Sequence, residues 1–211
     1  MPFKLFGKGA DDKPEERPAP APALLPTGIP FDALTDEWRL VGVMEIKGRL
    51  SDALNRREAI SLAAVSWAPV EGDGPFEPAP GIRSVDPYDL IVVLGGADSQ
   101  PALDERQREA HRLHKVAYDV ALDCPPFRVI GTIHLFPGTD PARLLDRQTE
   151  LFVPVTDALT FVGERRIGEE SEVALVNRSY LKGVEQIDRR TNAPVTPLPG
   201  MPLGGTSFGT R

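Results

Sequence analysis

Arginine, carboxylate and amide side chains stand close together at three places in the chain, and this combination is typical of sites that bind anionic groups. Each place adjoins an apolar segment that could order its backbone. The candidate ligand-binding residues are Arg49, Asp52, Asn55, Arg56, Asp140, Arg147, Asn177 and Arg178. A structural interpretation is also open, in which each Asp caps a helical turn and each Arg pairs with a nearby acid.

Histidines are the next residues that could do chemistry. His111 and His114 are three residues apart and would share one face of a helix, where Asp104 or Glu109 could join them around a metal. The alternative is a solvated, charged connector, and we favour it. His134 lies on the opposite face of its predicted strand from the apolar residues, so we expect it to be exposed. We predict no metal site and no cofactor.

Catalytic signatures are weak. The single Cys124 excludes an internal disulfide and a cysteine-only zinc site. No serine stands in a nucleophile-elbow pattern, which leaves a Cys124–His134 pair or a Ser–His–Asp set as the open catalytic candidates. Gly95 and Gly96 follow an aliphatic segment, but the residues after them lack the pattern of a phosphate loop. We therefore predict that the protein is not an enzyme.

The elements that must position these residues recur along the chain. Four blocks repeat in the same order, and each unit reads as strand, turn, strand, loop and strand. The matched blocks are residues 38–46 with 127–135, 48–56 with 138–147, 59–67 with 151–161, and 89–94 with 172–177. Gly42 and Gly131 fall in the middle of the first strands, where glycine usually marks a bulge or a sharp bend. We interpret the pattern as an internal duplication.

Apolar residues alternate along the predicted strands, so one face of each strand should be buried. The predicted core of the first unit is Leu40, Met44, Ile46, Leu54, Leu62, Ile91 and Val93. The predicted core of the second unit is Val129, Ile133, Leu135, Leu145, Val153, Val155, Leu175 and Leu181. In the turns, we expect Ser51 or Asp52 to cap the first and Asp140 to cap the second, with Pro141 at the first helical position.

The repeated blocks resemble a group of uncharacterised bacterial proteins. Their mark is a strand ending in Gly, an Arg-Leu-Ser-Asp-x-Leu-Asn turn, a further strand, and Val-Asn-Arg followed by an aliphatic strand. Residues 49–55 match the turn, and residues 176–178 match Val-Asn-Arg. The resemblance covers most of residues 36–188 and implies no activity. The first unit departs from it, because residues 93–96 stand where Val-Asn-Arg is expected.

Proline and charge set the domain organisation. The chain has 211 residues and 22 prolines, and much of the proline lies near its two ends. We predict disordered tails at 1–32 and 191–211, β units at 33–100 and 116–190, and a possibly helical connector at 101–115. The fold class is mainly β, with tandem small barrel-like or strongly bent sheets and short helical turns. Each tail carries a short apolar patch that could dock on a partner: Phe3, Leu5, Phe6, Met201, Leu203 and Phe208.

The composition of the chain limits the classes of partner that it can bind. The net charge of −7 disfavours nucleic acid, whose phosphates an acidic protein repels. No apolar run approaches the roughly 20 residues of a membrane helix, and no secretory signal is visible, so we expect a cytoplasmic protein.

Three functions remain. The first is a non-enzymatic protein-interaction or scaffolding module whose exposed edge strands add a strand or self-associate. The second is a sensor that binds a small anionic ligand or a nucleotide between the two units. The third is a metal-dependent enzyme. We favour the first, with another protein or a second copy as partner.

Overall fold

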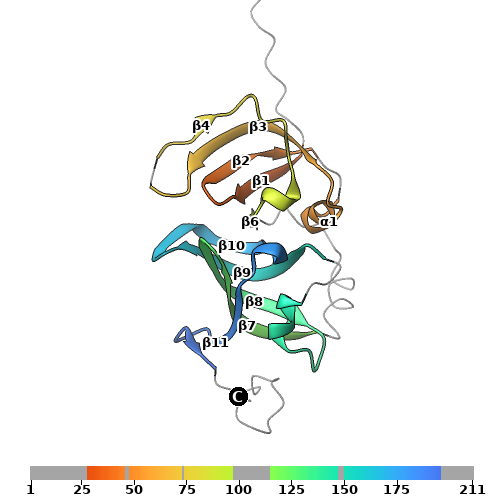
Figure 1. Ribbon diagram of the computed structural model, residues 1–211, viewed down its shortest axis with the longest axis vertical. Coiled ribbons are helices and arrows are strands. Elements are labelled where there is room, and N and C mark those ends of the chain that lie inside the picture. Colours follow the sequence, from red (N-terminus) through yellow and green to blue (C-terminus); the bar gives the residue numbers. More distant parts are fainter. Residues whose placement is uncertain (1–27, 46–47, 73, 97–114, 147–149, 196–211) are drawn as a thin grey trace, which may run out of the picture.

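The computed structural model describes residues 28–45, 48–72, 74–96, 115–146 and 150–195 (Figure 1). The predicted docking patches, the connector at 101–114, Ile46, Arg147, His111 and His114 lie outside these ranges. No helix in the described ranges is long and apolar enough to cross a membrane.

The described chain is mainly β, as predicted from the sequence. We call residues 28–96 the first half and residues 115–195 the second half. The first half contains β1 (Ile29–Leu34), β2 (Trp38–Met44), α1 (Leu50–Asn55), β3 (Ile60–Pro69), β4 (Glu77–Pro78), β5 (Ser84–Val85), η1 (Pro87–Asp89) and β6 (Val92–Gly95). The second half contains β7 (Val116–Cys124), β8 (Phe127–Leu135), η3 (Pro141–Leu145), β9 (Phe152–Val162), β10 (Arg165–Asn177), η4 (Arg178–Tyr180), β11 (Gly183–Asp188) and β12 (Ala193–Pro194). β1 thus begins inside the range assigned to the N-terminal tail.

The strands form one antiparallel sheet of twelve strands in the described residues, in the order β12-β11-β7-β8-β9-β10-β6-β1-β2-β3-β4, with β5 also paired to β3. The sheet bends strongly but is not closed into a barrel, so the expectation of barrel-like units is wrong. The physical reason is the pairing of β6 with β10. Through this pairing each of the two strands forms hydrogen bonds with the other half. Neither half therefore closes its own strands into a barrel.

The two halves share the same strand pairing. In each half a first strand pairs with a second, the second with a third, and a last strand returns beside the first. The matching Cα pairs are Ala33–Leu40 with Leu122–Val129, Val41–Ser66 with Ile130–Leu159, and Leu34–Val92 with Asp123–Gly183. These ladders align β6 with β11 and η1 with η4.

This alignment differs from the sequence comparison, which matched residues 89–94 with 172–177. By the ladders, Asp86 is the counterpart of Asn177, and both cap a 3₁₀ helix. The Asp86 side chain accepts a hydrogen bond from Tyr88 N at 2.9 Å, and the Asn177 side chain accepts one from Ser179 N at 2.9 Å. In the strand pairing, residues 85–87 of the first half therefore hold the position that residues 176–178 hold in the second half.

Both halves also bend at the same place. The ladder register shifts beside Gly42 and beside Gly131, as the sequence predicted. On the facing strands, Ala64 and Asp157 adopt left-handed backbone angles, with φ of 50° and 49°. A Cβ on Gly131 would lie 2.6 Å from Val155 Cγ1 and 2.8 Å from the Thr156 carbonyl oxygen. Only glycine fits so close an approach of two strands.

The two hydrophobic cores lie on opposite faces of the central strands. The first-half cluster surrounds Phe31, Met44 and Leu54, and the second-half cluster surrounds Val120, Val129 and Val155. In β6, Val93 belongs to the first-half cluster, whereas its two neighbours belong to the second-half cluster. Altogether, the buried residues that enter the other half's cluster are Leu34, Val70, Ile91, Val92 and Leu94 from the first half, and Leu151, Phe152, Val173 and Leu175 from the second.

Most of the predicted core is confirmed. Buried as expected are Leu40, Met44, Leu54, Leu62, Ile91, Val93, Val129, Ile133, Val153, Val155, Leu175 and Leu181. Leu135 is only half-buried, near the end of β8. The prediction that Leu145 is buried is wrong, because its side chain is 45% exposed and Leu144 is buried instead. With three residues per turn of a 3₁₀ helix, Pro141 and Leu144 share the inner face of η3.

We expect Gly131→Ala to lower the free energy of unfolding by about 1–3 kcal/mol, because its methyl group would overlap Val155 and the backbone of β9. Gly81→Ala is the matched control, since a Cβ there meets nothing within 4 Å. Urea denaturation of both variants measures the difference. Equal stability of the two would contradict the close strand approach described here.

Candidate functional site

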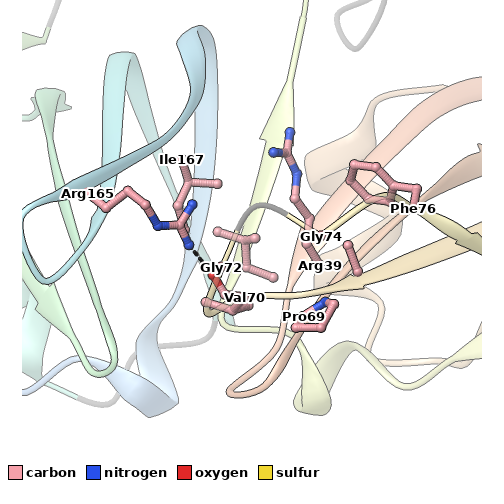
Figure 2. A pocket seen from close by; sticks show the side chains of 10 residues that line it. Arg39, Pro69, Val70, Gly72, Gly74, Phe76, Arg165 and Ile167 are labelled. Carbon is pink, nitrogen blue, oxygen red and sulfur yellow. Dashed lines mark hydrogen bonds between the residues drawn. The ribbon is translucent and has the colours of Figure 1, made fainter.

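A pocket of about 190 Å³ opens between the two halves, where the first half meets the hairpin of β9 and β10 (Figure 2). The β6–β10 pairing brings β10 beside the loop that follows β3. The pocket is lined by Leu34, Arg39, Ala68, Pro69, Val70, Gly72, Gly74, Phe76, Arg165 and Ile167. Figure 2 shows Arg165 and Ile167 on one side, with Arg39 and Phe76 on the other.

Arg39 is fixed on β2 by a bidentate contact with Asp32 of β1. Its Nε donates to Asp32 Oδ1 at 2.9 Å and its Nη2 to Oδ2 at 2.7 Å. This hydrogen bonding with Asp32 raises the pKa of Arg39 and outweighs the opposing effect of burial. Its Cζ also lies 5.6 Å from the centre of the Phe76 ring. A guanidinium group has five N–H donors, so three remain after the contacts with Asp32.

Arg165 reaches the same pocket from the start of β10. It donates a hydrogen bond from Nη2 to the carbonyl oxygen of Val70, across the boundary between the halves. Ile167, two residues further along β10, is buried against the second-half cluster. The strand then passes close to Arg39, since a Cβ on Gly168 would lie 3.3 Å from Arg39 Nη2. Both guanidinium groups are thus held by contacts that depend on the sheet register.

Neither Arg39 nor Arg165 is among the binding residues predicted from the sequence. A signal for Arg39 was present, because the repeated strand carries Arg at this position in both halves, as Arg39 and Arg128. Arg128 makes its own ion pairs, with Asp123 at 2.9 Å and Glu185 at 3.2 Å. No comparable pattern marks Arg165, whose partner Val70 is 95 residues away.

Three of the sequence-predicted residues meet elsewhere on the boundary between the halves. Asn55, at the end of α1, accepts a hydrogen bond from Phe152 N at 2.9 Å. Asn177 is fully buried and donates from Nδ2 to the Leu90 carbonyl at 2.8 Å. Arg178 donates its backbone N–H to the Leu151 carbonyl at 2.8 Å. The hydrogen bonds of Asn55 and Asn177 join the two halves. They favour the interpretation that these two side chains stabilise the structure.

The Arg178 guanidinium group is partly buried and only partly satisfied. Its Nε and Nη1 are inaccessible to solvent and have no hydrogen-bond partner among the residues that the structure describes. Burial lowers the pKa of Arg178, and the charge of Glu150 partly offsets this effect.

The other predicted residues are not assembled into a site. Arg49 stands at the N-cap position of α1, and its side chain makes no capping hydrogen bond. The expectation that Ser51 or Asp52 caps this helix is therefore wrong. Asp52 and Arg56 are exposed. Asp140 caps η3 as predicted, accepting a hydrogen bond from Ala142 N at 2.9 Å, with Pro141 at the first position. η3 packs beside β11.

The catalytic candidates are held apart by the β7–β8 hairpin. Cys124 pairs with Phe127 at one end, and His134 pairs with Ala117 at the other. Seven residue steps along β8 lead from Phe127 to His134, or roughly 23 Å at about 3.3 Å per residue. Burial, and secondarily the charge of Asp123, raises the pKa of the Cys124 thiol to about 12. Its sulfur is therefore a protonated core group and a poor nucleophile.

His134 is exposed, as expected. Its Nε2 lies 3.3 Å from Thr156 Oγ1. In the described ranges, no three His, Cys, Asp or Glu side chains converge in a way that could hold a metal ion. The His111 and His114 pair lies outside these ranges.

No protein-family model, curated protein or solved structure matches this chain.

We expect Cys124 in the folded protein to resist a thiol-selective reagent at pH 8.5 and to react promptly in denaturant. The folded pKa of about 12 exceeds the ordinary value of about 8.5, so the unfolded chain loses the thiol proton first. This group's contribution to stability is therefore present below pH of about 8.5 and is lost as the pH rises towards 12. Mass spectrometry of labelled protein checks the reactivity. Fast labelling under native conditions would contradict the buried, protonated thiol.

Proposed function

We propose that the protein is a non-enzymatic binding module that holds a small anionic ligand in the pocket between its two halves. The observation that carries the proposal is the convergence of Arg39 and Arg165, from opposite halves, on one concave site. Guanidinium groups recognise carboxylate and phosphate through charge-assisted, often paired hydrogen bonds. The Phe76 ring gives the same site an apolar wall.

The size and charge of the pocket limit the kinds of ligand that it can hold. A volume of about 190 Å³ is below the roughly 300–1,000 Å³ of pockets that enclose drug-sized molecules. A carboxylate or phosphate group with few further atoms fits better than a whole nucleotide. The ion pair with Asp32 reduces the net positive charge that Arg39 brings to the pocket. We expect weak, salt-sensitive binding.

The lining residues favour binding over catalysis. Apart from the two arginines, the described residues that line the pocket are aliphatic, proline, glycine and phenylalanine residues. None of these side chains can act as a nucleophile or exchange a proton near neutral pH. Arginine stays protonated, so it can orient and neutralise an anion without transferring a proton.

We expect inorganic phosphate to produce saturable amide chemical-shift changes at Gly72, Gly74, Phe76 and Arg165 in an NMR titration. Arg165→Gln should weaken this binding at least about tenfold, because a lost charge-assisted hydrogen bond costs about 1.5–3 kcal/mol. Arg143→Gln is the control, since Arg143 is exposed on η3. Shifts that stay linear, or that spread over the surface without these residues, would refute the pocket as an anion site.

The two halves are proposed to descend from one duplicated unit. Their matched ladders, the paired bulges at Gly42 and Gly131, and the capped 3₁₀ helices support this origin. The boundary pocket would then have arisen from the joining of two units, because each half supplies one of its arginines.

A second candidate function is protein interaction, and the edges of the sheet favour it. Within the described residues, β5 pairs with β3 alone. On its outer side, β11 is covered by β12 only at Ile187 and Asp188, with one further hydrogen bond from Val195 N to the Gln186 carbonyl at 2.8 Å. Unpaired strand edges offer backbone groups to another chain.

A further inference from the structure

The junction between β6 and β10 shows how one half of this protein binds another. The last strand of the first half, β6, pairs antiparallel with β10, the strand that follows β9 in the second half. The facing Cα pairs are Val92–Val176, Val93–Leu175, Leu94–Ala174 and Gly95–Val173. One more bond, from Asn177 N to the Ile91 carbonyl at 2.9 Å, extends the pairing by another position.

The matched ladders identify the same two surfaces at the far ends of the sheet. β11 corresponds to β6, because both return beside the first strand of their half with the same register. β5 corresponds to the end of β10, since Val85 pairs with Ile60 as Val176 pairs with Val153. Within the described residues, each molecule thus carries a second copy of each side of its internal junction, and no strand pairs with the outer edge of β5 or with residues 182–185 on the outer edge of β11.

The charges on these two edges are complementary when they are placed in the internal register. The Leu94–Ala174 pair corresponds to Glu185 facing Arg83, and the Ile91–Asn177 position corresponds to Lys182 facing Asp86. Arg83, Asp86 and Lys182 are exposed, and the Glu185 side chain is 43% exposed. Opposite charges directly facing each other stabilise an antiparallel pair, whereas like charges oppose it.

We propose that the protein associates with a second copy of itself head to tail, with β11 of one molecule pairing with β5 of the next. This names the partner of the protein-interaction function proposed above, and it does not depend on the anion pocket. Val184 would face Ser84 as Val93 faces Leu175, and Asp86 N would donate to the Lys182 carbonyl. The interface joins two different surfaces, so it either closes into a ring or continues as a filament.

The intermolecular contact is weaker than the internal one for two reasons. Apolar residues that are buried at the internal junction are replaced by charged or small polar ones at the outer edges, with Ser84 in place of Leu175 and Glu185 in place of Leu94. Glu185 is also shared with Arg128, whose Nη2 lies 3.2 Å from Glu185 Oε2. β12 covers β11 from Gln186 onwards and leaves residues 182–185 for the second copy. The association is therefore reversible and sensitive to salt.

Charge exchange on the full chain tests this proposal by sedimentation velocity, from micromolar to sub-millimolar concentration at low salt. Wild type should form larger species as its concentration rises. Arg83→Glu and Glu185→Arg should each weaken self-association about tenfold or more, since each places like charges face to face. An equimolar mixture of the two variants should recover association, because every interface in an alternating assembly again joins opposite charges.

Asp86→Lys and Lys182→Asp form an independent pair for the same experiment, so that misfolding of Glu185→Arg does not decide the result. Arg143→Glu is the control, because it changes an exposed charge on η3 and should leave association unchanged. A wild-type chain that stays monomeric, single variants that associate like wild type, or mixtures of both variant pairs that stay monomeric would each overturn the proposal. None of these outcomes affects the phosphate titration, which reports on different residues.

Discussion

The pairing of β6 with β10 is the interaction on which the rest of the structure depends. Where they pair, both strands are buried on both faces, because the sheet changes here from covering one hydrophobic cluster to covering the other. A strand in this position has no solvated side, which explains the unbroken aliphatic run of residues 90–94. Asn177 closes the end of the pairing through its backbone N–H and its buried amide.

This junction makes the two halves energetically inseparable. Leu151, Phe152, Val173 and Leu175 complete the cluster of the first half, and a comparable set from the first half completes the other cluster. Neither half can bury its central strand alone. The pocket between the halves results from the same geometry, because the register that aligns β6 with β10 also brings Arg165 to Val70 and the bend at Gly168 to Arg39.

Local patterns in the sequence were sufficient for the strands, the bends and one helix cap. Alternating apolar residues located most of the core, the mid-strand glycines located both bulges, and Asp140 with Pro141 located η3. Each of these features depends on residues within a few positions of each other. The exposed Leu145 shows the limit of such reasoning, since α-helical and 3₁₀ turns place different residues inward.

The boundary between the halves could not be predicted in this way. Its contacts join residues about ninety positions apart, such as Asn177 with Leu90 and Arg165 with Val70. The fourth pair of matched sequence blocks differs from the strand pairing for a related reason. β10 is a continuous strand of 13 residues, whereas prolines at 78 and 80 break its counterpart into β4 and β5, of two residues each. The aliphatic run of β6 therefore looked like the better match.

The shared cores also have a consequence for synthesis of the chain. A ribosome completes β6 long before it completes β10, and at about 5–20 residues per second the interval is roughly 4 to 16 seconds. During that time Leu34, Val92 and Leu94 have no cover, although they are buried in the finished protein. The nascent first half thus exposes an apolar strand that can associate with other exposed apolar segments. The first half can complete its folding only after the second half has been synthesised. Chaperones that recognise exposed aliphatic segments can bind the chain during that interval.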